Sequence, residues 1–172
     1  MRAMGPGSVA SLLKIALDVA YFLLWAVLAI VVLVLVASLF IPIDSWTANA
    51  RGEQIPITRT LIAAVLGGVS VFIGGFLLIL HRLRRIFVTL TMGDPFQPEN
   101  VRRLRAIGVI LASLIAAQFA FRSVLAMLLP NAIEPQSIGD LMIPLFSLLV
   151  IFVLAEVFRE GARLRRDAEL TI

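Results

Sequence analysis

Four long stretches with little or no charge dominate the pattern of hydrophobic and polar positions along the chain. They cover residues 19–43, 60–80, 106–129 and 138–158, and the charged side chains within them are Arg122, Asp140 and Glu156. Each stretch approaches or exceeds the ~20 residues that a helix needs to cross a hydrocarbon core of ~30 Å. Because lipid offers no hydrogen-bond partners to an open strand, each stretch is predicted to be helical. The pattern therefore predicts one all-α domain over residues 1–172, an integral membrane bundle of four transmembrane helices.

The first stretch has one competing interpretation, a cleaved signal peptide. Residues 48–50 read Ala-Asn-Ala, which resembles the small-x-small pattern before a cleavage site. The apolar run is, however, far longer than the ~7–15 residues of a signal peptide. We therefore interpret it as a membrane span.

Composition supports the membrane interpretation and removes several classes of function. Hydrophobic residues make up 60% of the chain, against about 45–50% in a soluble domain. There is no cysteine and one histidine, His81, which excludes a disulfide framework, a thiolate metal site and a multi-histidine site within one protomer. The sequence also contains no Ser-His-Asp constellation and no glycine-rich phosphate loop. We therefore predict a protein that is not an enzyme and has no cofactor.

The basic residues orient the bundle. Of the 15 arginines and lysines, all but Arg51, Arg59 and Arg122 lie before the first stretch, between the second and third, or after the fourth. The positive-inside rule therefore predicts both termini in the cytoplasm, for a multi-pass protein of a bacterial inner membrane. This topology explains the basic composition through contact with anionic lipid at the cytoplasmic face. The basic loop has no helix-turn-helix or zinc module, so direct binding to nucleic acid is not expected.

The long cytoplasmic loop, residues 81–105, is predicted to be a helical hairpin, which we call the elbow. Its first part carries an apolar stripe opposite the arginines, so the second helix should continue past the membrane surface; the stripe comprises Leu83, Ile86, Phe87 and Leu90. Gly93 is placed to end that helix, and Pro98 and Glu99 suit the first turn of the next. Before the first span, Lys14 and Asp18 have the i,i+4 spacing of an ion pair.

Small residues in the second span predict close helix packing. They recur at helical spacing, which lets two backbones approach in lipid; the residues are Ala63, Gly67, Ser70 and Gly74, with Ala64 and Gly68 as a further pair of small residues four apart. Packing against another helix of the same protomer is one interpretation, and a homo-oligomer interface is the other.

Three polar residues within the spans are candidate sites because burying them in lipid is costly. Arg122, with Gln118 one turn away, lies about 10 Å from the end of its helix, and an arginine near mid-membrane costs at least ~2.5–3.5 kcal/mol. It is expected to snorkel or to pair with Glu134 or Asp140; the functional alternative is contact with an anion or a lipid headgroup on the outer side. Glu156 is expected to pair with nearby arginines; the alternative is binding a proton or a cation.

Two segments of the chain resemble a known family. Residues 93–108 read Gly-Asp-Pro-Phe-Gln-Pro-Glu-Asn-Val-Arg-Arg-Leu-Arg-Ala-Ile-Gly and are similar to a signature of the domain of unknown function 2975 (DUF2975) family. Residues 158–172, which end in Leu-Thr-Ile, resemble its C-terminal ending; glycine at position 93 is a minor departure. The resemblance implies a small bacterial four-span membrane protein, of a kind often encoded beside a small helix-turn-helix regulator.

By that resemblance, the expected function is to tether or control a soluble helix-turn-helix regulator at the cytoplasmic face. Both distinctive segments face the cytoplasm, and loops on a scaffold often carry function. The amide of Asn100 both donates and accepts, so it is suited to fix the elbow or to cap the C-terminal segment. The expected contact residues are Phe96, Pro98, Glu99, Asn100, Arg103, Gly161, Leu164, Leu170, Thr171 and Ile172.

Two alternatives stay open at this point. The C-terminal segment, residues 159–172, is equally suited to pack on the elbow and only stabilise the bundle. A small oligomeric transporter or channel subunit is the alternative function, with a polar path formed by Arg122, Gln118 and Glu156.

Overall fold

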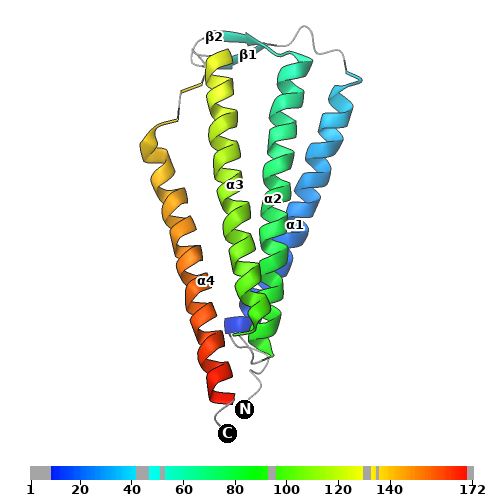
Figure 1. The fold of residues 1–172 in the computed structure, drawn as a ribbon. Helices are drawn as coiled ribbons and strands as arrows, with labels where there is room; N and C mark the ends of the chain where they lie inside the picture. Colours follow the sequence, from blue (N-terminus) through cyan, green and yellow to red (C-terminus); the bar gives the residue numbers. More distant parts are fainter. Residues whose placement is uncertain are drawn as a thin grey trace.

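A computed structural model of the chain describes residues 9–41, 47–50, 53–92, 96–129, 133–134 and 136–169. Four long helices account for most of these residues (Figure 1); they are α1 (Val9–Ser38), α2 (Arg59–Thr91), α3 (Pro98–Leu128) and α4 (Met142–Glu169). All four are long and apolar enough to cross a membrane. The prediction of an all-α bundle with four membrane-spanning helices is therefore confirmed.

Two short elements complete the fold. The strands β1 (Thr47–Ala50) and β2 (Glu53–Pro56) pair antiparallel between α1 and α2, with Thr47 opposite Pro56. A 3-10 turn, η1 (Ile138–Leu141), leads into α4. Asp140 closes a capping box there, because its Oδ2 accepts from the Ser137 backbone N–H at 3.0 Å.

The helices are arranged in a row rather than in a closed ring. Within the described part of the chain, α1 packs on α2, α2 on α3 and α3 on α4, and α4 packs on neither α1 nor α2. Figure 1 shows that the helices approach one another where α2 ends, α3 begins and α4 ends, and spread apart toward the strands. We call the first of these the elbow end and the other the hairpin end.

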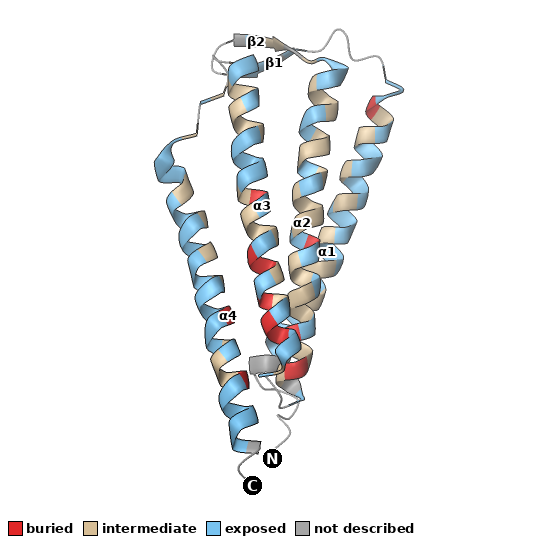
Figure 2. Cartoon of the chain, in the orientation of Figure 1, coloured by how far each residue is buried: buried red, intermediate tan, exposed pale blue. Residues whose placement is uncertain are grey.

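The protein core lies at the elbow end. A buried cluster joins α2, α3 and α4 there, and it comprises Ile86, Leu104, Ile107 and Ala155. Figure 2 shows most of the buried residues in the parts of α2 and α3 nearest this end, whereas large apolar side chains elsewhere are exposed. Exposed apolar surface on membrane-spanning helices suits contact with lipid, so side-chain burial within the protein is concentrated at one end.

Helix ends follow the local sequence. α3 begins at Pro98 as predicted, with Glu99 in its first turn, and α2 continues past the apolar stretch to Thr91 as predicted. The expectation that the first helix reaches residue 43 is wrong, because α1 ends at Ser38 and the next two amides bond three residues back in tighter turns. A proline at position 42 accounts for this, since it disfavours a helical conformation in the residue before it. The expected helix stop at Gly93 lies outside the described residues.

Candidate functional site at the elbow end

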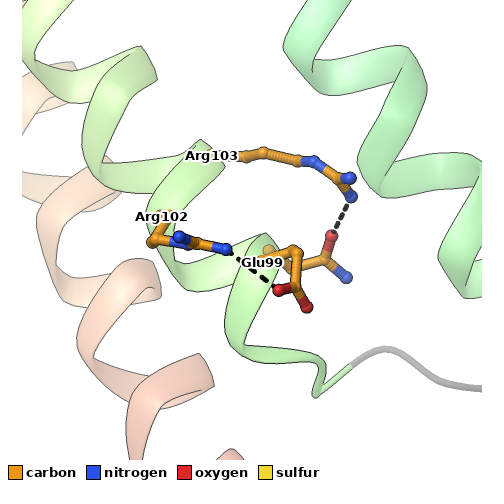
Figure 3. Close-up of polar contacts among 4 residues, drawn as sticks. Glu99, Arg102 and Arg103 are labelled. Carbon is orange, nitrogen blue, oxygen red and sulfur yellow. Dashed lines mark hydrogen bonds and ion pairs between the residues drawn. The ribbon is translucent and has the colours of Figure 1, made fainter.

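Asn100 joins α2 to α3 at the elbow end. Its side chain is fully buried. The amide Nδ2 donates to the Thr89 hydroxyl at 2.6 Å, and that hydroxyl donates to the Ile86 carbonyl at 2.7 Å. The Asn100 Oδ1 accepts from Arg103 Nη1 at 2.8 Å (Figure 3). A buried amide with these partners fixes two helices relative to each other, since leaving any of the polar groups unsatisfied costs about 1–3 kcal/mol.

Phe96 joins the elbow to α4. Its ring lies 5.6 Å from that of Phe158, centroid to centroid, in a tilted arrangement. A Cβ at Gly161 would lie 2.5 Å from Phe96 Cδ1, so the ring rests directly on the backbone of α4. Only glycine leaves room for this contact. The structure thus brings together the two segments that carry the family resemblance, although they are more than 50 residues apart.

The contact between α3 and α4 continues along one seam. A Cβ at Gly108 of α3 would lie 3.0 Å from Phe152 of α4. Ala155 and Ala162, two turns apart on α4, are 2% and 6% exposed, so this face of α4 is closely packed. Small residues on both helices permit that approach.

Charged side chains surround this packed centre at the surface. Arg102 pairs with Glu99 at 3.0 Å on the first turns of α3 (Figure 3). On α4, Arg163 lies 3.5 Å from Glu160, and Arg159 pairs with Glu156. The expectation that Glu156 pairs with a nearby arginine is therefore confirmed. All of these side chains are substantially exposed, so each pair contributes little to stability, about 0–1 kcal/mol. Their main effect is to present alternating charge at the elbow end.

The remaining predicted contact residues differ in accessibility. Pro98, Glu99 and Leu164 are exposed, with Leu164 at 60%. Asn100 is buried and forms part of the scaffold rather than of the surface. Residues 170–172 lie outside the described part of the chain, so the structure gives no position for Leu170, Thr171 and Ile172.

The three predicted intramembrane polar residues are not brought together. Because Phe152 packs on Gly108, Glu156 lies one turn from that contact toward the elbow end. Arg122 lies fourteen residues from Gly108 in the opposite direction, about 21 Å at 1.5 Å per residue. Gln118 and Arg122 therefore lie well apart from Glu156 along the helix axes, and the polar path of a transporter or channel subunit stays a prediction.

Arg122 also lacks the partner expected for it at Asp140. The Asp140 carboxylate is engaged in the cap of η1. Within the described residues, no hydrogen bond or ion pair involves the half-buried Arg122 side chain. The pairing with Asp140 is therefore wrong.

The close approach of α2 to α3 occurs at Gly68, which belongs to the predicted small residues, and at Gly75, one residue away from the predicted Gly74. A Cβ at Gly67 or Gly74 would meet nothing within 4 Å, so packing inside the protomer at these two glycines is wrong. At Gly75 a Cβ would lie 2.5 Å from Leu114 Cδ2, and at Gly68 it would lie 3.0 Å from Phe121 Cζ. The hydroxyl of Ser70 donates to the Leu66 carbonyl of its own helix at 2.8 Å. Ala63, the fourth predicted residue, is half-buried.

A protein-family model described as "Protein of unknown function (DUF2975)" matches residues 46–172 of the chain. The chain belongs to the DUF2975 family. The match includes β1 and β2, helices α2, α3 and α4, and the whole elbow site. No curated protein and no solved structure matches the chain.

The DUF2975 region offers no evident site for a metal. Among its described residues, and in the described part of α1, no three His, Cys, Asp or Glu side chains are grouped to hold an ion. What the elbow end of this DUF2975 protein presents chemically is a rigid, mixed-charge surface around a buried amide and an aromatic contact.

Proposed function

We propose that this DUF2975 protein is a non-enzymatic protein of a bacterial inner membrane that binds a soluble helix-turn-helix regulator at its elbow end. The observation that carries the proposal is the contact of Phe96 with Gly161. It joins the two most distinctive segments of the family resemblance into one structural unit, outside the apolar part of the bundle.

The arrangement of buried and exposed residues supports this assignment. Asn100, Thr89 and Phe96 hold the elbow and α4 in a fixed geometry, which reduces the entropy that a partner must pay for on binding. Pro98, Glu99 and Leu164 lie around that scaffold and are exposed. The proposed contact surface therefore consists of these three residues with the exposed arginines and glutamates beside them.

The charge distribution supports a cytoplasmic position for this surface. Most of the arginines lie in or next to the elbow end, and basic residues are retained on the cytoplasmic side of inner-membrane proteins. A soluble regulator would have access to the elbow end only in that orientation.

The proposal is tested by affinity purification of the full chain from native membranes, followed by mass spectrometry and reconstitution with the purified partner. We expect a small helix-turn-helix protein to copurify with the wild-type chain and to be lost from Leu164→Glu, which places a charge on the exposed surface. Gln54→Glu, which adds the same charge to an exposed position on β2, is the control and should retain it. Failure of the wild-type chain to bind any such regulator would sink the proposal.

A further inference from the structure

A basic hollow lies between α1 and α2 near the elbow end, lined by none of the residues that join the elbow to α4. Its volume is about 240 Å³, and its lining comprises Lys14, Asp18, His81, Arg84, Arg85 and Val88. Three of these side chains are cationic and one is a carboxylate, so the lining has a net charge of +2 with the histidine neutral.

The single carboxylate is already neutralised. Arg84 Nε donates to Asp18 Oδ1 at 2.5 Å. The same guanidinium lies over the ring of Tyr21, 4.5 Å from its centroid. An ion pair and a cation–π contact hold this arginine in one position, and the hydrogen bond to Asp18 uses only its Nε.

The other basic side chains of the hollow have no acceptor among the described residues. Within the part of the chain that the structure describes, no hydrogen bond or ion pair involves Lys14, His81 or Arg85, and none involves the terminal nitrogens of Arg84. A fixed guanidinium next to two further cations is the arrangement that proteins use for phosphate, because planar N–H groups match its oxygens. The hollow is therefore suited to a phosphate group.

An apolar hollow follows along the same helix. It measures about 680 Å³ and is lined by Trp25, Leu28, Ala29, Val32, Leu33, Val36 and Ala37. Lys14, Asp18, Trp25, Val32 and Val36 follow one another at spacings of four or seven residues, so they share one face of α1. The apolar hollow starts seven residues beyond Asp18, about 10 Å along the helix axis. The basic and apolar hollows thus lie in series on one face.

Aromatic rings mark the boundary between the two hollows. Tyr21 lies 6.4 Å, ring centroid to ring centroid, from both Trp25 and His81. Tyrosine and tryptophan are enriched where membrane headgroups meet the hydrocarbon. The order along α1 is therefore cation, aromatic belt, apolar surface, which is the order of a phospholipid from phosphate to acyl chain.

We propose that α1 and α2 bind one anionic phospholipid at a defined site. Its phosphate lies in the basic hollow beside Lys14, Arg84 and Arg85, and an acyl chain lies along the apolar hollow of α1. Free phosphate would use the first hollow and leave the second empty, so the paired hollows assign the ligand as a lipid. The lining of this site includes none of Pro98, Glu99 and Leu164, the exposed residues proposed to bind a regulator.

Native mass spectrometry of the full chain in detergent tests the charge requirement. Phosphatidylglycerol is titrated against phosphatidylethanolamine and, separately, against inorganic phosphate. In Lys14→Gln/Arg85→Gln we expect phosphatidylglycerol affinity to fall roughly 25-fold, since each basic residue near an anionic surface contributes on the order of fivefold. Arg105→Gln/Arg166→Gln removes the same charge from exposed positions on α3 and α4 and should bind normally. The site would be overturned if the wild-type chain retained phosphatidylglycerol and phosphatidylethanolamine equally. It would also be overturned if both double variants lost the same phosphatidylglycerol affinity.

A second pair of variants tests the acyl chain. Val32→Trp fills the apolar hollow, whereas Val34→Trp lies on the opposite face of α1; the two valines are 41% and 46% exposed. We expect only Val32→Trp to weaken phosphatidylglycerol binding, with an unchanged thermal midpoint in both. If inorganic phosphate displaces the lipid at equal concentration, or if both variants bind normally, the lipid assignment is wrong.

Discussion

The amide of Asn100 donates a 2.6 Å hydrogen bond to the hydroxyl of Thr89, so the first turn of α3 is tied to the last turns of α2. Both side chains are buried, and the bond closes the elbow from within. The polar chain continues to Ile86 on one side and to Arg103 on the other. This connection holds α2 and α3 in a fixed relative position at the elbow.

Replacing Asn100 with alanine should destabilise the protein by about 2 kcal/mol. The change removes hydrogen bonds to Thr89 and Arg103 and leaves polar groups without partners in a buried place. Unfolding in detergent, followed by circular dichroism, measures the effect. Gln118→Ala is the control, because it removes an exposed amide from the same helix; an equal loss in the control would contradict the role given to Asn100.

Gly161→Ala should destabilise the contact between the elbow and α4 by about 1–3 kcal/mol. The new methyl group would lie 2.5 Å from Phe96 Cδ1, and relief of such overlap requires the ring or the helix to move. Combining it with Phe96→Ala should cost less than the sum of the two single changes. Gly139→Ala is the control, since its nearest neighbour would lie at an ordinary 3.7 Å. Strict additivity of the two single variants would refute the contact.

The packing of α2 distinguishes neighbouring glycines. Gly75→Leu should abolish folding or expression, because even a Cβ there overlaps Leu114, whereas Gly74→Leu should be tolerated. Expression level and thermal midpoint in detergent compare the two variants directly. If Gly74→Leu abolished folding and Gly75→Leu did not, a different face of α2 would lie against α3. Loss of folding in both variants would indicate an additional interface between two copies of the chain.

Membrane orientation can be tested cleanly because the chain has no cysteine. We expect an impermeant thiol reagent added to intact cells to label Gln54→Cys on β2, and to label Glu99→Cys on α3 only after the membrane is opened. The reason is the concentration of arginine at the elbow end. Labelling of position 99 in intact cells would invert the topology.

Long apolar stretches and local helix signals could be read from the sequence, and these predictions held. The apolar stripe from Leu83 to Leu90 predicts that α2 continues beyond its apolar span, and Pro98 with Glu99 predicts where α3 begins. Both signals act within one or two turns of helix, so they can be read from the sequence. The apolar stretches alone likewise indicated four membrane-spanning helices.

Pairings between helices could not be read in the same way. Lys14 and Asp18 have the right spacing for an ion pair, yet the recorded ion pair of Asp18 among the described residues is with Arg84 of α2. Side chains one turn apart on a helix compete with others brought near only by tertiary packing. The spacing alone cannot decide that competition.

The face of α2 that packs on α3, in contrast, could have been predicted from the sequence. Gly75 and Gly68 lie eleven and eighteen residues before the buried Ile86, which are near-integral numbers of helical turns. Continuing the apolar stripe of the elbow back into the membrane therefore selects these two glycines rather than Gly67 and Gly74. The same continuation along α3 relates Asn100 to Leu104 and Ile107, which explains why a polar residue is buried.

Among the described parts of the four long helices, α4 packs on α3 alone, so only one end of it is held by another helix. Ala155 and Ala162 are clamped against the seam with α3, whereas Met142, Ile143 and Phe146 at the far end of the helix are 66–78% exposed. From Phe152, where the seam begins, to Met142 the helix extends about 15 Å beyond its contact with α3. A tilt of about ten degrees there displaces the free end by roughly 3 Å over that length, while the seam itself hardly moves. We therefore expect α4 to move most in its first turns and least beside Phe96.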